Sequence, residues 1–226
     1  VLEPLASGLA VLTPREKERG ALLVDMGGGT TDVVGFRRGR ICYTGIIPVG
    51  GYQFTNDISL TYNTTYAAAE AAKLKYGSTE LRAYFSDEEV SLPVVGQTKE
   101  LRVPRLDLCR LTRERAQELA RMIKLLLGDA ELGEPWETSI VLTGGGAILD
   151  GMPEIADQIF DLPIRRGCPV GVGGLTDHVN NPAFATGVGL VMYAHRNQLL
   201  EQERAGGVGA LGGVVGRLRG LFKEFF

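Results

Sequence analysis

The segment Asp25-Met26-Gly27-Gly28-Gly29-Thr30-Thr31-Asp32 is the most informative part of the sequence, because it places three glycines between two short apolar runs. These runs cover residues 21–25 (ALLVD) and 31–36 (TDVVGF), and a third run over 41–49 follows the turn signal Arg38-Gly39. Three strands joined by tight turns make an antiparallel meander. The sequence therefore predicts such a meander, with a glycine hairpin between its first two strands.

The glycine hairpin has the composition of a phosphate-binding loop. It lacks the Lys of a Walker loop, and a dinucleotide fingerprint would need a helix, not a strand, after its glycines. Bare glycine backbone can approach phosphate closely and present successive N–H groups to it. Thr30 and Thr31 add hydroxyl donors, and Asp25 and Asp32 could hold Mg²⁺ through its water ligands. A plain turn is the alternative, but it requires neither the threonines nor the aspartates.

A second glycine loop, Thr143-Gly144-Gly145-Gly146-Ala147, ends an apolar run over 139–143 and precedes a helix predicted over 152–160. Ligands of open α/β sheets bind at the carboxyl ends of the strands. These glycines could therefore lie against a nucleotide base or phosphate. Strand-to-helix connections often use glycine, so this loop alone leaves both interpretations open.

Glu70 and Lys73 lie three residues apart on a helix predicted over 66–76, so both side chains can reach one point. They could bind a ribose or the edge of a base. The commoner alternative is an exposed ion pair within the helix, which contributes little to stability.

The composition is that of an ordinary globular protein, with 44% hydrophobic and 23% charged residues. The net charge of −3 excludes a generally basic nucleic-acid binder, and we expect no nucleic-acid partner. Cys42, Cys109 and Cys168 are far apart, without zinc or disulfide spacing, which fits a reducing cytoplasm. No apolar run approaches the roughly 20 residues of a transmembrane helix.

The end of the chain has the pattern of a membrane-surface helix. Glycines within 196–213 predict a flexible linker, and 214–226 predicts an amphipathic helix with its apolar side chains in one arc of about 140°. Basic residues at the edges of that arc can reach lipid phosphate. A helix packed on the protein's own core is the alternative, and the loose linker argues against it. The residues predicted to bind the membrane are Val214, Val215, Arg217, Leu218, Arg219, Leu221, Phe222, Lys223, Phe225 and Phe226.

Together these motifs resemble those of the actin-like ATPase superfamily, and most closely its bacterial cell-division branch, the FtsA family. Residues 25–32 are similar to the second phosphate motif of that family, and 143–147 with 149–153 (LDGMP) to its adenosine motif. Residues 70–77 (EAAKLKYG) resemble its nucleotide-side helix, and 181–189 (NPAFATGVG) its connecting helix. The resemblance covers nearly the whole chain, and the combination is more specific than any one motif.

The resemblance implies an α/β fold of the actin-like, ribonuclease H-like type, in which two lobes face a nucleotide cleft. This chain resembles the second lobe only. Residues 1–56 and 139–195 would form its large nucleotide-binding subdomain, and 57–138 an inserted small α/β subdomain. The chain opens with Val1 inside an apolar segment, so we expect a fragment that lacks the first lobe.

Carried over residue by residue, the resemblance implies ATP and Mg²⁺ as ligands. The implied contacts are Asp25 with Mg²⁺ through water, Gly27, Gly28, Gly29, Thr30 and Thr31 with the phosphates, Glu70 and Lys73 with the ribose, and Gly144, Gly145, Gly146 and Ala147 with the adenosine. No residue stands out as a general base, so slow ATP hydrolysis at most is expected.

The resemblance also implies a polymerising adaptor that anchors the FtsZ ring to the inner face of the cytoplasmic membrane at the division septum. Its partners would be FtsZ, docked on the small subdomain, further copies of itself in an actin-like polymer or dimer, and the anionic membrane surface. A pilus-assembly adaptor and a sugar or acetate kinase of the same superfamily are the alternatives. Neither needs a lipid-binding helix at its end.

Overall fold

The computed structural model describes residues 2–82, 85, 87–129, 139–173 and 179–198. The predicted membrane helix at 214–226 and most of the predicted linker at 196–213 lie outside the described residues.

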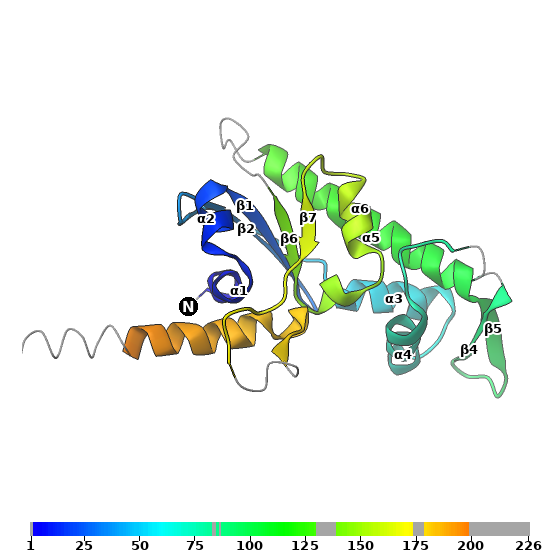
Figure 1. Ribbon diagram of the computed structural model, residues 1–226. Coiled ribbons are helices and arrows are strands. Elements are labelled where there is room, and N and C mark those ends of the chain that lie inside the picture. The colour runs from blue at the N-terminus through cyan, green and yellow to red at the C-terminus, as the bar shows by residue number, and fades with distance from the viewer. Residues whose placement is uncertain (1, 83–84, 86, 130–138, 174–178, 199–226) are drawn as a thin grey trace, which may run out of the picture.

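A mixed five-stranded sheet forms the centre of the molecule, in the order β3-β2-β1-β6-β7 (Figure 1). The first three strands pair antiparallel, and β6 and β7 continue the sheet with parallel pairing. The strands are β1 (Ala21–Met26), β2 (Thr31–Arg37), β3 (Arg40–Ile47), β6 (Ile140–Thr143) and β7 (Ile164–Arg166). The predicted meander is therefore confirmed.

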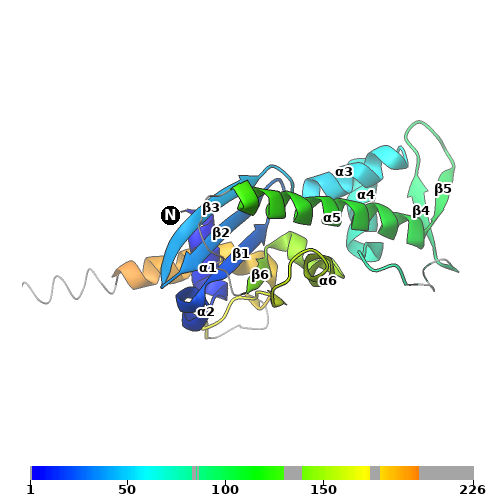
Figure 2. The same cartoon turned by 90° about the horizontal axis from the view of Figure 1, so that it is seen from above.

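Helices cover both faces of this sheet, which explains why every residue of β1 and of β6 is buried (Figure 2). On one face, α5 (Arg105–Asp129) and α6 (Met152–Asp157) pack into the larger hydrophobic core. On the other face, α1 (Glu3–Val11) and a helix over residues 185–198 pack into a second core. The short α2 (Pro14–Arg19) lies at the edge of this layer, and η3 (Pro182–Phe184) leads into the helix over 185–198.

A smaller group of elements lies beside the sheet, at the right of Figure 1. It consists of α3 (Gly51–Thr61), α4 (Tyr66–Tyr76) and a hairpin of β4 (Glu89–Pro93) and β5 (Glu100–Pro104). Ile58, Leu92 and Leu108 contribute to its separate core. α4 ends before Gly77, as predicted, and begins after Thr65, whose hydroxyl accepts a hydrogen bond from the Ala68 N–H.

The long helix α5 starts earlier than the sequence suggests. We expect a start at Thr112 from its capping chemistry, but the helix begins at Arg105, directly after β5. The Thr112 hydroxyl donates instead to the Leu108 carbonyl, 2.7 Å away and one turn back in the same helix. The helix α6 is also shorter than predicted, since it ends at Asp157.

Two helices join the sheet to the smaller group. In α3, Phe54 belongs to the larger core of the sheet and Ile58 to the core of the smaller group. Likewise, α5 contributes Leu108 to the smaller group and Leu119 to the sheet. The boundary predicted after residue 56 thus falls inside α3, because one helix serves both cores. The division into two subdomains stays a prediction.

Candidate functional site

The glycine hairpin between β1 and β2 is fixed to the first turn of α3. Within the hairpin, the Gly27 N–H donates to the Thr30 carbonyl at 2.9 Å. The Gly51 N–H donates to the Gly27 carbonyl at 3.0 Å, and the Tyr52 N–H to the Gly28 carbonyl at 2.7 Å. The hairpin carbonyls thus satisfy donors that a helix start otherwise leaves unpaired. This arrangement holds the hairpin in place while Gly28 and Gly29 stay exposed.

Gly50 must be a glycine for this contact to form. A Cβ at this position would lie 2.7 Å from the Gly27 carbonyl oxygen and 2.8 Å from the Gly28 carbonyl carbon. Both are backbone atoms of the hairpin, so a side chain at residue 50 would push the hairpin off α3. Gly50 and Gly51 are therefore the residues against which the hairpin packs.

Asp25 lies at the end of β1 and is almost fully buried, with 8% of its surface exposed. Burial raises the pKa of its carboxyl, although hydrogen bonds from Ser7 and Thr186 act in the opposite direction. The Thr186 hydroxyl donates to Asp25 Oδ2 at 3.1 Å. Gly144, with a φ of +81°, fits against the same carboxylate, since a Cβ there would lie 2.5 Å from Oδ1.

Asp32 is the cross-strand partner of Asp25, so two carboxylates share this end of the sheet. Burial raises the pKa of Asp32, and the charges of Asp25 and Glu3 raise it further. Carboxylate oxygens suit a hard cation such as Mg²⁺. Within the described ranges, however, no three His, Cys, Asp or Glu residues are grouped to hold a metal ion directly. A contact of Asp25 with Mg²⁺ through water stays a prediction.

Glu70 and Lys73 are not a simple exposed ion pair. Lys73 Nζ lies 2.8 Å from Glu70 Oε2, and the Lys73 side chain is only 12% exposed. The same ammonium donates to Thr55 Oγ1 at 2.8 Å and to the Gly51 carbonyl at 3.1 Å. These three acceptors match the three protons of a lysine. The pair therefore ties α4 to the first turn of α3, which holds the hairpin.

Thr55 completes this network from the interior of α3. Its buried hydroxyl donates to the Glu70 carboxylate and accepts from Lys73. Burial alone would raise the pKa of Glu70, but the hydrogen bonds from Lys73 and Thr55 outweigh it, and the pKa lies below the ordinary value. Glu70 is thus held ionised next to the Lys73 ammonium.

A pocket of about 820 Å³ lies between the hairpin, α3, α4 and the loop after β6. This volume lies within the usual range for a small-molecule site. Apolar side chains of α4 and η2 (Gly145–Ile148) meet polar backbone of the hairpin across it. The lining residues are Gly27, Gly28, Gly29, Gly51, Tyr52, Phe54, Tyr66, Glu70, Lys73, Leu74, Lys75, Gly77, Arg105, Gly145, Gly146, Ile148, Leu149 and Asp150.

Seven of the residues predicted to bind nucleotide line this pocket: Gly27, Gly28, Gly29, Glu70, Lys73, Gly145 and Gly146. Thr31 lies elsewhere, because its fully buried hydroxyl donates to the Val49 carbonyl at 2.7 Å. Ala147 is fully buried in the larger core, and Gly144 packs on Asp25. Thr30 is exposed at the hairpin but is not among the lining residues.

Sequence reasoning missed Thr55, Tyr52 and Tyr66. The two tyrosine rings stack at the pocket, with centroids 5.3 Å apart. Tyr66 precedes Glu70 by one helical turn, so the helical spacing could have placed it on the same face. Nothing near Thr55 in the sequence indicates its partners on α4.

The family model described as "Cell division protein FtsA" matches residues 22–189. The chain belongs to the FtsA family. Over 198 residues it is 40% identical to the FtsA of Pseudomonas aeruginosa, covering 88% of this chain and 48% of that protein. The FtsA of Neisseria meningitidis serogroup B is 38% identical over 241 residues, covering 100% of this chain and 56% of that protein. The chain thus spans about half the length of these curated FtsA relatives.

Solved structures agree on an actin-like fold, as predicted. Spiroplasma citri MreB5 bound to ADP superposes with a TM-score of 0.68 at 20% identity, covering 89% of this chain and 61% of that chain. A PilM–PilN type IV pilus biogenesis complex gives a TM-score of 0.58 at 22% identity, covering 85% of this chain and 51% of that chain. In this FtsA-family chain, the described helices include none that is long and apolar enough to cross a membrane.

Proposed function

We propose that this chain is the nucleotide-binding second lobe of an FtsA-type protein, which binds ATP, polymerises and anchors the FtsZ ring to the membrane. The observation that carries the nucleotide part is the convergence of two glycine loops and the Glu70–Lys73 network on one pocket. Similar folds have been solved with nucleotide, namely MreB5 with ADP and with AMPPNP.

Each wall of the pocket suits one part of ATP. Exposed backbone at Gly28 and Gly29 would donate to the phosphates. Asp25 is not among the residues that line the pocket, and from its buried position near the end of β1 it would hold Mg²⁺ through water. Glu70 would accept hydrogen bonds from the ribose hydroxyls. Lys73, whose three protons already have acceptors in the protein, would lie beside the ribose and hold Glu70 in position. Gly145 and Gly146 would let the adenosine lie flat against backbone.

Binding by these residues alone should be weak. One lobe covers one side of the nucleotide and leaves the other in water, where charged hydrogen bonds are weaker. We expect a millimolar or looser dissociation constant for Mg·ATP. Hydrolysis would be slow at most, since the pocket offers no evident general base among its described residues.

The membrane part of the proposal rests on the predicted helix at 214–226. A single copy would bind anionic lipid reversibly, and a polymer would bind more strongly because many copies act together. Assembly controlled by ATP would therefore set how long the protein stays on the membrane at the septum. FtsZ would dock on the smaller group of elements.

Membership of the FtsA family favours this adaptor over the two alternatives. The likeness to a pilus complex at 22% identity reflects the shared fold. A coupled assay with sugars or acetate and ATP would identify a kinase by product formation, which we do not expect.

Amide chemical-shift perturbation with millimolar Mg·ATP tests the nucleotide site directly. We expect shifts at Gly27, Gly28, Gly29, Gly145 and Gly146, with smaller shifts on the far face of the sheet. Shifts confined to other residues, or micromolar affinity by isothermal titration, would contradict the proposal. Co-sedimentation with anionic vesicles, comparing the chain with one stopped at Gly213, tests the anchor separately.

A further inference from the structure

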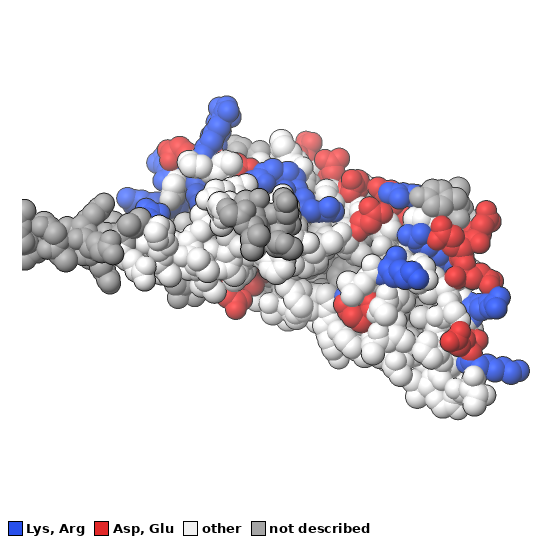
Figure 3. Space-filling model, turned by 60° about the horizontal axis from the view of Figure 1, so that its bottom comes forward, with Lys and Arg blue, Asp and Glu red and all other residues white. Residues whose placement is uncertain are grey.

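One end of the molecule concentrates positive charge, although the whole chain carries a net charge of −3. The charge comes from α2, from the turn between β2 and β3, and from the last turn of the helix over 185–198. In Figure 3 blue side chains stand at the left of the described surface. We call this surface the basic end, and its basic residues are Arg15, Lys17, Arg19, Arg37, Arg38, Arg40 and Arg196.

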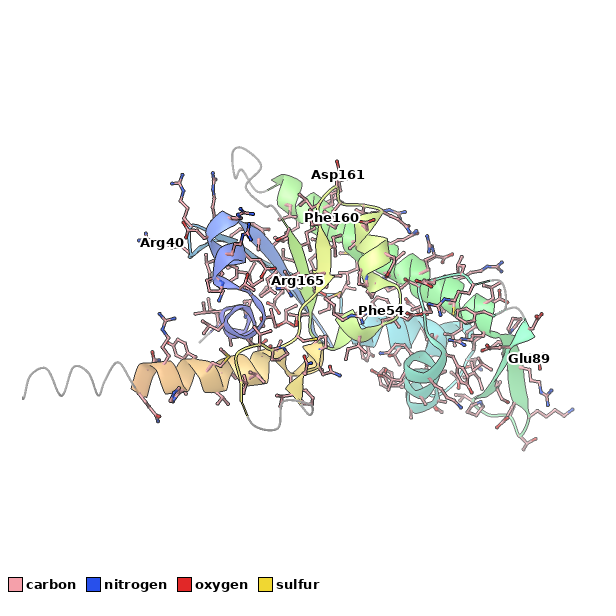
Figure 4. The ribbon with its side chains drawn as sticks, in the orientation of Figure 1. Arg40, Phe54, Glu89, Phe160, Asp161 and Arg165 are labelled. Carbon is pink, nitrogen blue, oxygen red and sulfur yellow. The ribbon has the colours of Figure 1, made fainter. Side chains whose placement is uncertain are left out.

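Backbone hydrogen bonds hold the two main parts of the basic end together. The Arg38 N–H donates to the Glu18 carbonyl and the Gly39 N–H to the Lys17 carbonyl, both at 3.0 Å. The turn is therefore fastened to the last residues of α2. Arg40 projects outward from this junction (Figure 4). The backbone that carries these charges is therefore held in place before it meets a partner.

The acidic residues in this region neutralise little of the charge. Glu16 is occupied by Arg165, with an Nε–Oε1 distance of 2.7 Å, and by the capping box with Thr13. Glu18 is the other acidic residue of α2 and the one that can offset part of the positive charge. The six arginines of the basic end are exposed, and none forms an ion pair with a carboxylate in the part of the chain that the structure describes.

The helix over 185–198 brings the end of the described chain to the same surface. In Figures 1 and 2 this helix runs beneath α1 toward the end of the molecule that carries α2. Burial lowers the pKa of Lys17, and the charge of Arg196, in the last turn of this helix, lowers it further. Residue 198 is the last described residue before 199–226. The segment that contains the predicted membrane helix therefore leaves from the basic end.

We propose that the basic end is a second membrane contact, which lies against anionic lipid headgroups and orients the protein on the bilayer. This inference rests on the proposed membrane anchor at 214–226. An anionic leaflet attracts basic residues that come within a Debye length, and each such residue strengthens binding about five-fold. The anchor and its flexible linker would keep the basic end near the bilayer and allow it to reach the headgroups. The basic end would then fix which face of the protein looks toward the lipid.

A second copy of the chain is a less suitable partner. The opposite end carries Glu88 and Glu89 near the β4–β5 hairpin, but Glu88 pairs with Arg105 at 2.7 Å and Glu89 with Arg102 at 3.5 Å. These carboxylates are already compensated within their own copy. Lipid phosphates offer the dense, mobile negative charge that a broad arginine surface fits.

Co-sedimentation with vesicles of phosphatidylglycerol and phosphatidylcholine tests the proposal. The test variant is the full chain with Arg15→Gln, Arg37→Gln and Arg40→Gln, which leaves Arg38 with its φ of +52° unchanged. A matched control carries Lys99→Gln, Arg110→Gln and Arg121→Gln, which are all exposed and lie between β4 and β5 or on α5, outside the elements of the basic end. We expect the test variant to bind at least about ten-fold more weakly and the control to bind like the parent.

The outcomes separate this inference from the anchor itself. Equal binding by the test variant and the parent would overturn the basic-end contact, even if stopping the chain at Gly213 abolishes binding. If the chain stopped at Gly213 still binds vesicles, the predicted anchor at 214–226 is refuted. The three Arg→Gln changes, made in that shorter chain, would then still show whether the basic end contacts the lipid. Sedimentation velocity without lipid measures self-association. If the test variant self-associates more weakly than the parent but binds vesicles equally well, the basic end is a contact between copies of the chain.

A fluorescent probe tests the orientation. Cys42 is exposed two residues after Arg40, whereas Cys109 is buried and Cys168 can be replaced by serine. A probe on Cys42 should be quenched by headgroup-labelled lipid more strongly than a probe at Lys99→Cys in a Cys42→Ser background. Equal quenching at the two positions would contradict an oriented contact.

Discussion

The ammonium of Lys73 donates to the carbonyl of Gly51 at 3.1 Å, while the N–H of Gly51 donates to the hairpin carbonyl of Gly27 at 3.0 Å. One residue of α3 thus joins the charged face of α4 to the glycine hairpin. The two parts of the proposed nucleotide site are mechanically connected, so a change in one should be measurable in the other.

Loss of the Thr55 hydroxyl should weaken this connection. Thr55→Val keeps the shape but removes the hydroxyl that donates to Glu70 and accepts from Lys73, and we expect a loss of about 1–3 kcal/mol in the free energy of unfolding. Urea denaturation measures it. The exposed Thr61→Val in the same helix is the control and should change stability by less than about 0.5 kcal/mol. Similar stabilities for both variants would show that the network contributes nothing.

Lys73→Met should change the titration of Glu70. The pKa of Glu70 is lowered in the folded protein, so its contribution is present above the ordinary value of 4.5 and is lost as the pH falls through the lower folded pKa. Without the Lys73 ammonium, burial raises the pKa of Glu70. The protein then loses less stability when the pH falls, because Glu70 contributes less to begin with. Carboxyl NMR titration reads the pKa directly, and an unchanged pKa would mean that Lys73 does not hold Glu70 ionised.

Asp25→Asn should separate stability from ligand binding. Burial raises the pKa of Asp25, so its ionisation costs stability once the pH exceeds the ordinary value of 3.8. We expect the variant to gain about 0.5–2 kcal/mol at neutral pH and to lose the Mg²⁺-dependent part of ATP binding. Thermal unfolding with and without Mg·ATP tests both parts. A less stable variant would indicate that the charge is needed by the fold.

Two glycines of the site should respond differently to the same substitution. Gly50→Ala places a Cβ 2.7 Å from the Gly27 carbonyl oxygen, so we expect a loss of about 1–3 kcal/mol and shifted hairpin amides. Gly28→Ala meets no atom within 4 Å, so the fold should tolerate it while the methyl group obstructs phosphate. Urea denaturation and Mg·ATP titration distinguish the two effects. Unimpaired ATP binding by Gly28→Ala would place the phosphates elsewhere.

A second pair of glycines tests the packing of the helix over 185–198. A Cβ at Gly189 would overlap the Ala6 carbonyl of α1, whereas a Cβ at Gly187 meets nothing within 4 Å. Gly189→Ala should therefore destabilise the protein by at least about 1–3 kcal/mol. Gly187→Ala should stabilise it by about 0.5–1 kcal/mol, because alanine is the better helix former. Equal thermal midpoints for the two variants would contradict this close helix contact.

Elements with local signals could be predicted from the order of the residues. The apolar runs at 21–25 and 139–143 correspond, apart from Ser139, to the fully buried strands β1 (Ala21–Met26) and β6 (Ile140–Thr143), because only a sheet covered on both faces accepts such strands. Glycines at 27–29 fixed the hairpin between β1 and β2, and Gly77 fixed the end of α4. These features depend on neighbours a few residues away, which the sequence displays directly.

Tertiary structure alone decided which polar groups meet. Thr31 has the chemistry of a phosphate ligand, yet its hydroxyl is taken by the Val49 carbonyl, 18 residues away. Thr55 looks unremarkable in α3 but bridges Glu70 and Lys73. The basic end combines α2, the β2–β3 turn and Arg196, which are far apart in the chain. Such contacts depend on how whole elements pack, and no local pattern of residues encodes that packing.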